Sequence, residues 1–223
     1  LEVAVDSQRS EQTAGPVVVD LATAEQSIQA KALRYDADGD GHYDHASALI
    51  KSIRGSDPDA AVYWLARMLS SGEDPRFICR RLAILASEDI GLASPQALQM
   101  AAAAWTITER VGMPECQLTL SELAIYLATC PKSNAAAQAI WNAMSDVRDG
   151  QTVPVPRFLR DAHYGGAASI EHGTGYRNPH VDPDADQQDY LGVDNVYYEP
   201  TDHGFEAEIA RRILPAEQDS NDG

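Results

Sequence analysis

The sequence predicts an all-α fold of short helices that run antiparallel to one another. Five prolines recur at intervals of 17, 20, 19 and 17 residues: Pro58, Pro75, Pro95, Pro114 and Pro131. Each of them can open a new helix, since proline is well suited to the first helical position. Helices of about 12 to 17 residues joined by short links are typical of an antiparallel helical assembly. The stretch 46–147 contains no pattern typical of a strand, so we expect this region to be entirely helical.

The N-terminal part of the chain predicts one helix, an acidic loop and a second helix. Asp20 can cap a helix over 20–33 by accepting a backbone N–H. The acidic loop covers 36–44, and a further helix is expected over 46–54. We therefore expect the loop to separate two helices.

Two capped amphipathic helices are predicted within 54–93. Asp57 can cap the first, and Pro58 then occupies its first helical position. Gly72 can end this helix in the left-handed conformation, after which Asp74 caps the next one. The apolar residues of the first helix recur with helical spacing: Ala61, Trp64, Leu65, Met68 and Leu69. The second helix has its own apolar stripe: Phe77, Ile78, Leu82 and Leu85.

We expect Trp64, Met68 and Leu82 to lie in the core. An alanine-rich helix is expected over 95–111, and a leucine-rich helix follows Pro114. The segment after Pro131 predicts a helix over 135–147.

The composition changes after residue 150. Glycine and proline recur through 151–214, which predicts an irregular segment with short helices packed on the helical domain. A last helix is expected over 205–214, and the tail 215–223 is expected to be disordered.

The formal net charge of −17 is distributed unevenly along the chain. Residues 182–223 contain 12 acidic and two basic groups, a net charge of −10. Such acidity opposes nonspecific binding to DNA, because that binding depends on Lys and Arg displacing counterions from phosphates. Arg76, Arg80 and Arg81 could form a local basic face for DNA, although a solvated helix face is the commoner role of a short charge run.

The cysteines and the apolar runs indicate a reducing, aqueous environment. Cys79, Cys116 and Cys130 form no CxxC pair, and two of them lie among apolar helical residues. No apolar run approaches the roughly 18 residues needed to span a membrane. We therefore expect a cytoplasmic protein without a membrane segment.

Several motifs along the chain resemble those of one family, and they occur in that family's order. They read RGSDPDAAVYWLARML, ASEDIGLA, PKSNAA, YGGAASIEHGTGYRNPH and YYEPTDHGFEAEI. The stretch 20–214 thereby resembles the C-terminal part of the RarA/MgsA family, replication-associated recombination ATPases related to the Werner-helicase-interacting protein. The resemblance implies a helical oligomerisation domain of the clamp-loader C-terminal type, which follows an AAA+ core and assembles as a homotetramer.

The resemblance also implies a division of the chain into four parts. Residues 1–33 would be the end of the AAA+ lid and a linker, and 34–150 the helical oligomerisation domain. The irregular segment 151–214 and the tail 215–223 complete the chain.

The residues that bind nucleotide in such ATPases have no counterpart in this sequence. There is no GxxxxGK[ST] loop to hold phosphates, and no apolar run ending in Asp-Glu to hold Mg²⁺. We therefore assign no catalytic or cofactor-binding residue and expect no ATP hydrolysis by this chain. ATP and Mg²⁺ would belong to the motor of a longer parent protein. An ATPase assay of this chain tests the expectation that it does not hydrolyse ATP.

One loop has a partial resemblance to a calcium site. Asp36, Asp38 and Asp40 match the early ligand positions of an EF-hand loop. Ser47 stands where that loop needs a bidentate carboxylate, so we expect at most weak cation binding. A turn in which Asp and Gly make local hydrogen bonds is the favoured interpretation.

The function that we expect is assembly, with DNA and replication proteins bound through the full-length protein. Periodicity does not distinguish a core stripe from an interface stripe, but Trp105 or Trp141 is expected nearer a subunit contact. Two alternatives remain open: a monomeric helical scaffold that binds peptides, and an accessory domain that contacts DNA through Arg76, Arg80 and Arg81.

Overall fold

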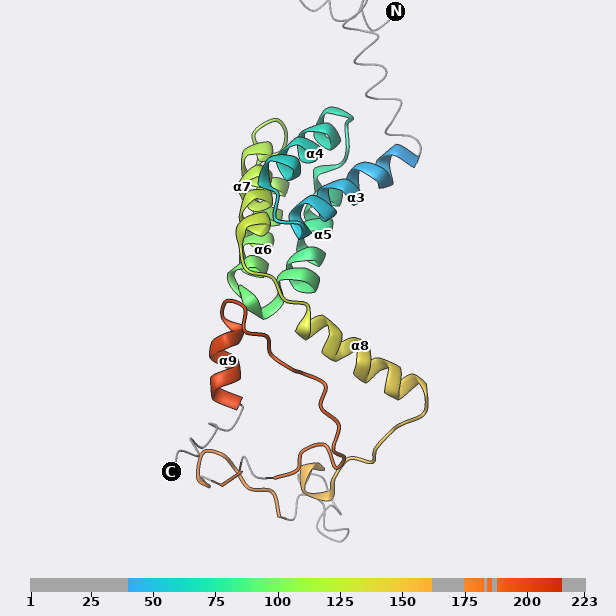
Figure 1. Cartoon of the computed structure of the whole chain (residues 1–223), viewed down its shortest axis with the longest axis vertical. Helices are drawn as coiled ribbons and strands as arrows, with labels where there is room; N and C mark the ends of the chain where they lie inside the picture. The colour runs from blue at the N-terminus through green and yellow to red at the C-terminus, as the bar shows by residue number, and fades with distance from the viewer. Residues whose placement is uncertain (1–39, 162–174, 183, 186–187, 214–223) are drawn as a thin grey trace, which may run out of the picture. The chain divides into compact units, whose positions relative to one another are not determined.

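The computed structural model describes residues 40–161, 175–182, 184–185 and 188–213. Every regular element in these ranges is a helix and none is a strand, which confirms the all-α prediction. The α-helices, labelled in Figure 1, are α3 (Asp40–Arg54), α4 (Pro58–Ser70), α5 (Pro75–Leu85), α6 (Gln96–Val111), α7 (Cys116–Thr129), α8 (Ala135–Arg148) and α9 (Glu206–Ile213). None of the helices in the described part of the chain is long and apolar enough to cross a bilayer.

Helix α3 begins earlier than the sequence pattern predicts. The helix expected over 46–54 starts at Asp40, so the predicted loop 36–44 ends at least five residues sooner. An acidic residue is favourable at the start of a helix, because the helix end is positive there, and Asp40 is the first residue of α3. The predicted helix 20–33, the tail 215–223 and the carboxylates of Asp36 and Asp38 lie outside the described residues.

The caps of α4 and α5 agree with the predictions. Asp57 accepts a hydrogen bond from the backbone N–H of Ala60 at 2.9 Å, and Asp74 accepts one from that of Arg76 at 2.9 Å. Gly72 ends α4 with φ of +83°, and its N–H donates to the carbonyl of Leu69 at 3.1 Å. These local signals fix where the two helices begin and where α4 ends.

The connection from α5 to α6 has a wide helical turn followed by a tight one. Helix α5 continues into η2 (Ala86–Ile90), a π-helical turn, and then into η3 (Gly91–Ala93), a 3₁₀ turn. Short π-helical turns are rare and are often found at functional sites. This connection is where the ASEDIGLA motif lies.

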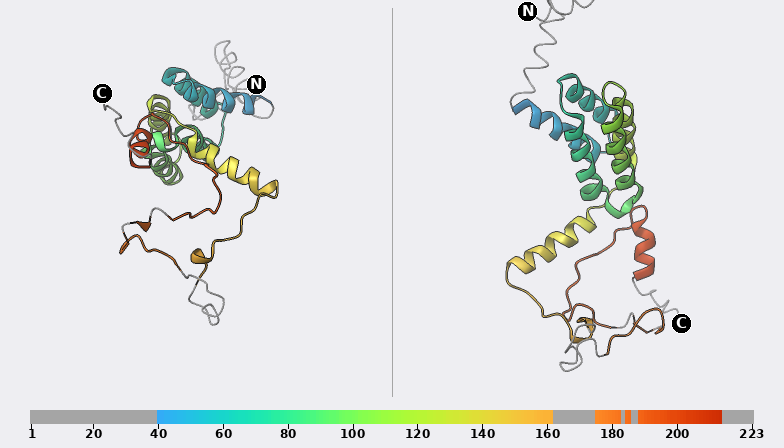
Figure 2. Two further views of the ribbon diagram at one scale, coloured as in Figure 1. Left: turned by 60° about the horizontal axis from the view of Figure 1, so that its bottom comes forward. Right: turned by 180° about the vertical axis from the view of Figure 1, so that it is seen from behind.

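The chain divides into two compact units. Unit 1 consists of Leu1–Ala137 with Pro200–Gly223, and unit 2 consists of Gln138–Glu199. Within unit 1, helix α3 packs on α4, and α7 packs on both α4 and α6, which is seen in both views of Figure 2.

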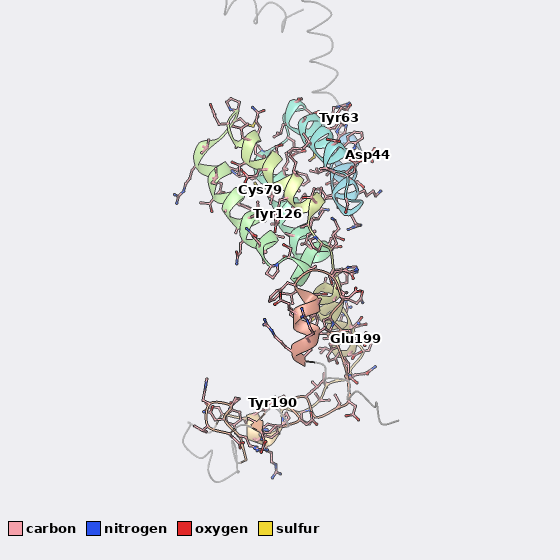
Figure 3. The ribbon with its side chains drawn as sticks, turned by 60° about the vertical axis from the view of Figure 1, so that its left-hand side comes forward. Asp44, Tyr63, Cys79, Tyr126, Tyr190 and Glu199 are labelled. Atoms are coloured by element: carbon pink, nitrogen blue, oxygen red, sulfur yellow. The ribbon has the colours of Figure 1, made fainter. Side chains whose placement is uncertain are left out.

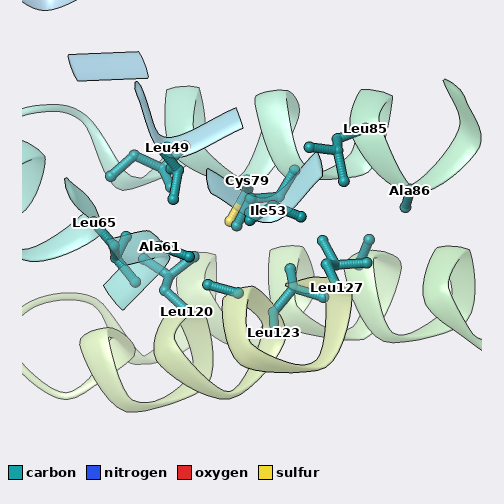
Figure 4. Packing of buried hydrophobic residues seen from close by; sticks show 14 of the residues in the cluster. Leu49, Ile53, Ala61, Leu65, Cys79, Leu85, Ala86, Leu120, Leu123 and Leu127 are labelled. Carbon is teal, nitrogen blue, oxygen red and sulfur yellow. The ribbon is translucent and has the colours of Figure 1, made fainter. Parts of the chain in front are cut away.

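The hydrophobic core of unit 1 is formed by side chains from α3 to α7. Figure 4 shows side chains from four of these helices pointing toward one another: Leu49, Ile53, Ala61, Leu65, Cys79, Leu85, Leu120, Leu123 and Leu127. Met68 and Leu82 are fully buried, as predicted. Trp64 was expected in the core and is only partly buried, because its ring lies at the edge of the cluster against His45 and Tyr63.

Two helix starts differ from the proline rule. Helix α7 begins at Cys116, two residues after Pro114, which follows Met113 through a cis peptide bond. Pro131 itself opens no helix, but α8 starts at Ala135, which confirms the start of the helix predicted over 135–147; the N–H of Ala135 donates to the side chain of Ser133. The start of α8 is therefore set by the cap at Ser133 and not by Pro131.

Unit 2 consists of most of α8, the short turn η4 (Arg157–Leu159) and an irregular chain. Tyr190, labelled in Figure 3, forms an edge-to-face pair with Phe158, with ring centroids 6.2 Å apart. The hydroxyl of Tyr197 donates to Asp146 at 2.8 Å, which attaches the irregular chain to α8.

Candidate functional site

Four of the motifs that carry the family resemblance meet in unit 1. They contribute the end of α3, the η2 turn, the loop between α7 and α8, and the segment that leads into α9. We call the polar side chains that join them the polar junction: Arg54, Ser56, Asp89, Lys132, Ser133 and Glu206.

The first contact of the polar junction is an ion pair between α3 and the η2 turn. Arg54 Nε lies 2.7 Å from Asp89 Oδ1, and its Nη2 lies 3.0 Å from Oδ2, so the pair is bidentate. The hydrogen bond to Asp89 is the main cause that raises the pKa of Arg54 above its usual value. Glu88 adds a second carboxylate at 3.7 Å. Since the Arg54 side chain is half exposed, solvent screens this pair and it contributes modestly to stability.

The second contact is made by Lys132. Its ammonium donates to Ser56 Oγ and to the carbonyl of Ala128, both at 2.8 Å, and to the carbonyl of Cys130 at 3.1 Å. Partial burial lowers the pKa of Lys132 below 10.5. A cation that binds the last carbonyls of a helix also interacts favourably with its negative end. Lys132 therefore ends α7 and links it to the loop after α3.

The third contact is a buried carboxylate. Glu206, the first residue of α9, is fully buried and accepts three hydrogen bonds at Oε2. Ser133 Oγ donates at 2.7 Å, Thr201 Oγ1 at 2.7 Å and the N–H of Thr201 at 2.9 Å. The hydrogen bonds offset the cost of removing this carboxylate from water, so Glu206 fixes α9 to the loop before α8.

Two glycines allow the backbones to approach closely at this point. Gly91 has φ of +50°, and a Cβ there would lie 2.8 Å from the carbonyl oxygen of Ser133. Gly204 has φ of +53°, and a Cβ there would collide with the carbonyl oxygen of Ala93. The next residue, Phe205, donates its N–H to that same carbonyl at 2.9 Å.

An apolar groove lies beside the polar junction. It has a volume of about 540 Å³ and runs between the η2 and η3 turns, the start of α6 and the start of α8. Its lining is Ala86, Ser87, Gly91, Leu92, Pro95, Leu98, Gln99, Ala102 and Ala136. We call it the apolar groove.

Helix α8 presents a second apolar surface. None of its residues is buried, and four large hydrophobic side chains on it are about half exposed. We call these residues the α8 stripe: Ile140, Trp141, Met144 and Val147. Such a concentration of apolar surface is unusual for a solvated helix and is typical of an interface.

The basic residues predicted to contact DNA lie on α5. Arg76 and Arg80 are exposed one turn apart, whereas Arg81 is partly buried. The Arg80 guanidinium lies 5.4 Å from the centre of the Phe77 ring. The geometry thus brings two of the three arginines to one exposed face, and their role in binding DNA stays a prediction.

The two tryptophans predicted near a subunit contact differ in exposure. Trp105 is partly buried against the core, and Trp141 is 48% exposed within the α8 stripe. Of the predicted calcium loop, only Asp40 lies in the described part, as the first residue of α3. Among the described residues, no group of three possible metal ligands occurs.

The three cysteines have the character of hydrophobic residues. Cys79, labelled in Figure 3, and Cys116 are buried, and Cys130 is partly buried. Burial is the main cause that raises the pKa of each thiol above 9.0, so all three are protonated at neutral pH. A protonated thiol is a poor nucleophile, and these positions are not reactive sites.

The chemistry of this region is that of attachment. The charged groups of the polar junction bind one another and the backbone, and they hold four segments in fixed register. Sequence reasoning missed the roles of Glu206 and Lys132, because one partner of each, Ser133 for Glu206 and Ser56 for Lys132, lies more than 70 residues away in the chain. The sequence does give one signal for each residue: Lys132 lies in the motif PKSNAA, and Glu206 lies in the motif YYEPTDHGFEAEI.

Comparison with known protein families identifies two matching segments. The family described as MgsA AAA+ ATPase C terminal matches 55–216, and the one described as AAA C-terminal domain matches 1–54. The boundary between them falls at the end of α3, beside the Arg54–Asp89 ion pair.

Three relatives illustrate how widely the similarity extends. An uncharacterized AAA domain-containing protein of Mycobacterium tuberculosis is 54% identical over 218 residues, which are 96% of this chain and 47% of the relative. The replication-associated recombination protein A of Bacillus subtilis is 44% identical, over 94% of this chain and 50% of its own length. The ATPase WRNIP1 of Dictyostelium discoideum is 41% identical, over 72% of this chain and 18% of its own length. The chain spans about half the length of the two bacterial relatives.

Proposed function

The chain belongs to the MgsA family of AAA+ ATPases, also called the RarA family, and on this premise we propose that it holds the ATPase motors of an oligomer together. The oligomer is a homotetramer. The whole protein hydrolyses ATP with Mg²⁺ in its AAA+ core and acts on DNA in the cytoplasm, with replication proteins as partners. This chain supplies the assembly surface and the attachment of that surface to the motor.

The observation that carries the assembly role is the α8 stripe. Its four side chains are each about half exposed, although they are among the larger apolar residues of the chain. Apolar surface of this kind favours association, because burial removes it from water at about 25 cal/mol per Å². Symmetric oligomers use such self-complementary surfaces.

The attachment to the motor is supported by helix α3. The segment that resembles an AAA C-terminal domain ends at residue 54, yet Leu49 and Ile53 of α3 are fully buried in the core formed with α4, α5 and α7. Close-packed cores transmit displacement rather than absorb it. A movement of α3 therefore moves the helices α4, α5 and α7, which form this core with it.

Sedimentation velocity of the chain tests the assembly role. We expect Trp141→Asp to reduce the sedimenting mass, because a charge in the α8 stripe opposes its burial. Leu118→Asp is the matched control, since Leu118 is 70% exposed on α7 and lies outside the stripe. If the wild type, Trp141→Asp and Leu118→Asp all have the same sedimenting mass, the proposed role of the stripe in assembly is wrong.

Contact with DNA is a second candidate function, favoured by the exposed face of α5. Arg76 and Arg80 lie one turn apart, so both can reach neighbouring phosphates. If they do, Arg76→Ala with Arg80→Ala lowers DNA affinity and reduces the salt dependence by about two phosphate contacts. Arg148→Ala on α8 is the control, and an equal effect of that change would exclude this face.

A further inference from the structure

We propose that the end of α3 controls the attachment of α9, so that displacement of α3 releases α9 from the rest of unit 1. All of the contacts that carry this inference lie within unit 1. They are the contacts that hold α9, those that hold its two supports, and the one made by a serine at the end of α3. The proposed attachment to the motor supplies the movement of α3, and the inference goes beyond it by naming the segment that responds.

Helix α9 is held mainly through its N-terminal end. Glu206 is the one buried residue of this helix, and Ile213 at the other end is 53% exposed. Helix α9 has eight residues, whereas isolated helices shorter than about 12 to 15 residues are marginal in water. The helix is therefore ordered while its first turn is attached, and it loses this order when the first turn detaches.

Two segments support the first turn of α9. The first support is the η3 turn, where the carbonyl of Ala93 accepts the N–H of Phe205 at 2.9 Å. The second support is the loop between α7 and α8, where Ser133 donates to Glu206 at 2.7 Å. The supports also meet each other, because a Cβ on Gly91 would lie 2.8 Å from the carbonyl oxygen of Ser133. A displacement of either support therefore disturbs the same turn of α9.

The end of α3 contacts both supports. Arg54, the last residue of α3, makes its bidentate ion pair with Asp89 in η2, the turn that leads directly into η3. Ser56 follows two residues later and accepts a hydrogen bond from Lys132 at 2.8 Å. Lys132 precedes Ser133 in the loop that forms the second support. One short segment at the end of α3 therefore holds both supports in place.

The second of these contacts is made by a serine in a position that usually contains glycine. Ser56 has φ of +61°, and its N–H and that of Asp57 donate to carbonyls in the last turn of α3. Glycine adopts this left-handed conformation without strain, whereas serine adopts it at a cost. A glycine would have no hydroxyl for Lys132 to bind. The serine therefore serves the contact with Lys132 rather than the end of the helix.

The two states of α9 differ in how well they bind the end of α3. While α9 is attached, η2 and the loop before α8 lie within reach of Arg54 and Ser56. Displacement of α3 breaks both polar contacts, and the supports are then no longer held by a common segment. Such coupling is reciprocal, so release of α9 also loosens the end of α3. The ordering and disordering of a short segment is a common form of conformational switch.

Hydrogen exchange of the backbone N–H of Phe205 tests the coupling. We expect Arg54→Ala to speed this exchange about three-fold, since the ion pair that it removes is half exposed and contributes modestly. Ser56→Ala removes the hydroxyl that Lys132 binds. The variant with both changes frees both supports, so we expect it to exchange about ten-fold faster than the wild type. An unchanged rate in this double variant overturns the inference.

Ile53→Val is the matched control for a general loss of stability. Ile53 is fully buried and precedes Arg54 on α3, so this change weakens the core and leaves both polar contacts in place. We expect it to leave the exchange of Phe205 close to the wild-type rate. If Ile53→Val speeds this exchange as much as Arg54→Ala does, the effect is a general loss of stability and the coupling is wrong.

Glu206→Ala tests the coupling in the reverse direction. We expect it to speed the exchange of the N–H of Asp57, which donates to the carbonyl of Ser52 at the end of α3. Glu208→Ala, at an exposed position of α9, should leave that exchange unchanged. If Glu206→Ala speeds the exchange of Phe205 alone, α9 detaches without an effect on α3 and the inference is overturned. The solution mass of the chain tests the assembly role independently, so the two proposals fail separately.

Discussion

Glu206 makes the buried contact that fixes α9 to the loop before α8, and its removal gives the most specific prediction about stability. In Glu206→Ala, the hydroxyl of Ser133 and two donors of Thr201 lose their shared acceptor. An unsatisfied buried donor costs about 1–3 kcal/mol. Thr201 is partly exposed and can bind water instead, so we expect Glu206→Ala to lower the free energy of unfolding by about 2–4 kcal/mol.

Two further variants determine how much of this loss comes from the carboxylate. Glu206→Gln keeps the shape and one acceptor oxygen but loses the charge, so its cost is expected at about 1–2 kcal/mol. Glu208→Ala is the matched control in the same helix, because Glu208 is exposed and pairs with Arg212 at 3.5 Å. A surface pair of this kind contributes less than about 0.5 kcal/mol.

Urea denaturation and hydrogen exchange measure the effect. The denaturation midpoint gives the change in stability if the slope with urea is unchanged. The N–H of Phe205, which donates to the carbonyl of Ala93, reports local release of α9 and should exchange faster in Glu206→Ala. If Glu206→Ala unfolds within 0.5 kcal/mol of the wild type and protects Phe205 equally, the attachment role of Glu206 is wrong.

Two other predictions concern the glycine contact and the thiols. Gly204→Ala should destabilise the chain more than Gly72→Ala, because a Cβ at 204 collides with a backbone carbonyl while the space at 72 is open, and both have positive φ; equal thermal shifts would contradict this. Stability should fall as the pH rises above 9.0, since burial raises the thiol pKa of Cys79 and Cys116 in the folded chain and the unfolded chain loses these protons first. Urea titrations of the wild type and of Cys79→Ala with Cys116→Ala between pH 8 and 10 test this, and an equal pH dependence of the two would rule out the thiols as its source.

The elements that the sequence predicts well are those set by local interactions. The caps at Asp57 and Asp74 act on N–H groups two or three residues away, so a short window contains all the information. The burial of Met68 and Leu82 follows from helical spacing, whereas Trp64 shows that an apolar position on the inner face can still lie at the edge of the core.

The features that the sequence did not predict depend on contacts between distant segments. The start of α8 at Ala135 agrees with the predicted helix over 135–147, but the contacts of the loop before it were not predicted: Lys132 binds Ser56 and Ser133 binds Glu206, each more than 70 residues away in the chain. Periodicity also does not predict that the α8 stripe is exposed, because an apolar stripe that faces a core and one that faces solvent have the same spacing.

The motifs themselves gave a partial indication of the site. The motifs are separate stretches of the sequence, and in the structure residues from four of them form the polar junction. A motif without a nucleophile or a metal ligand can thus mark an attachment point between segments.

The solution mass of this 24.1 kDa chain, measured by light scattering over a wide range of concentrations, tests the central claim most directly. The assembly role predicts a mass of about four chains at high concentration, falling through intermediate values on dilution. A mass of one chain throughout the range would contradict it.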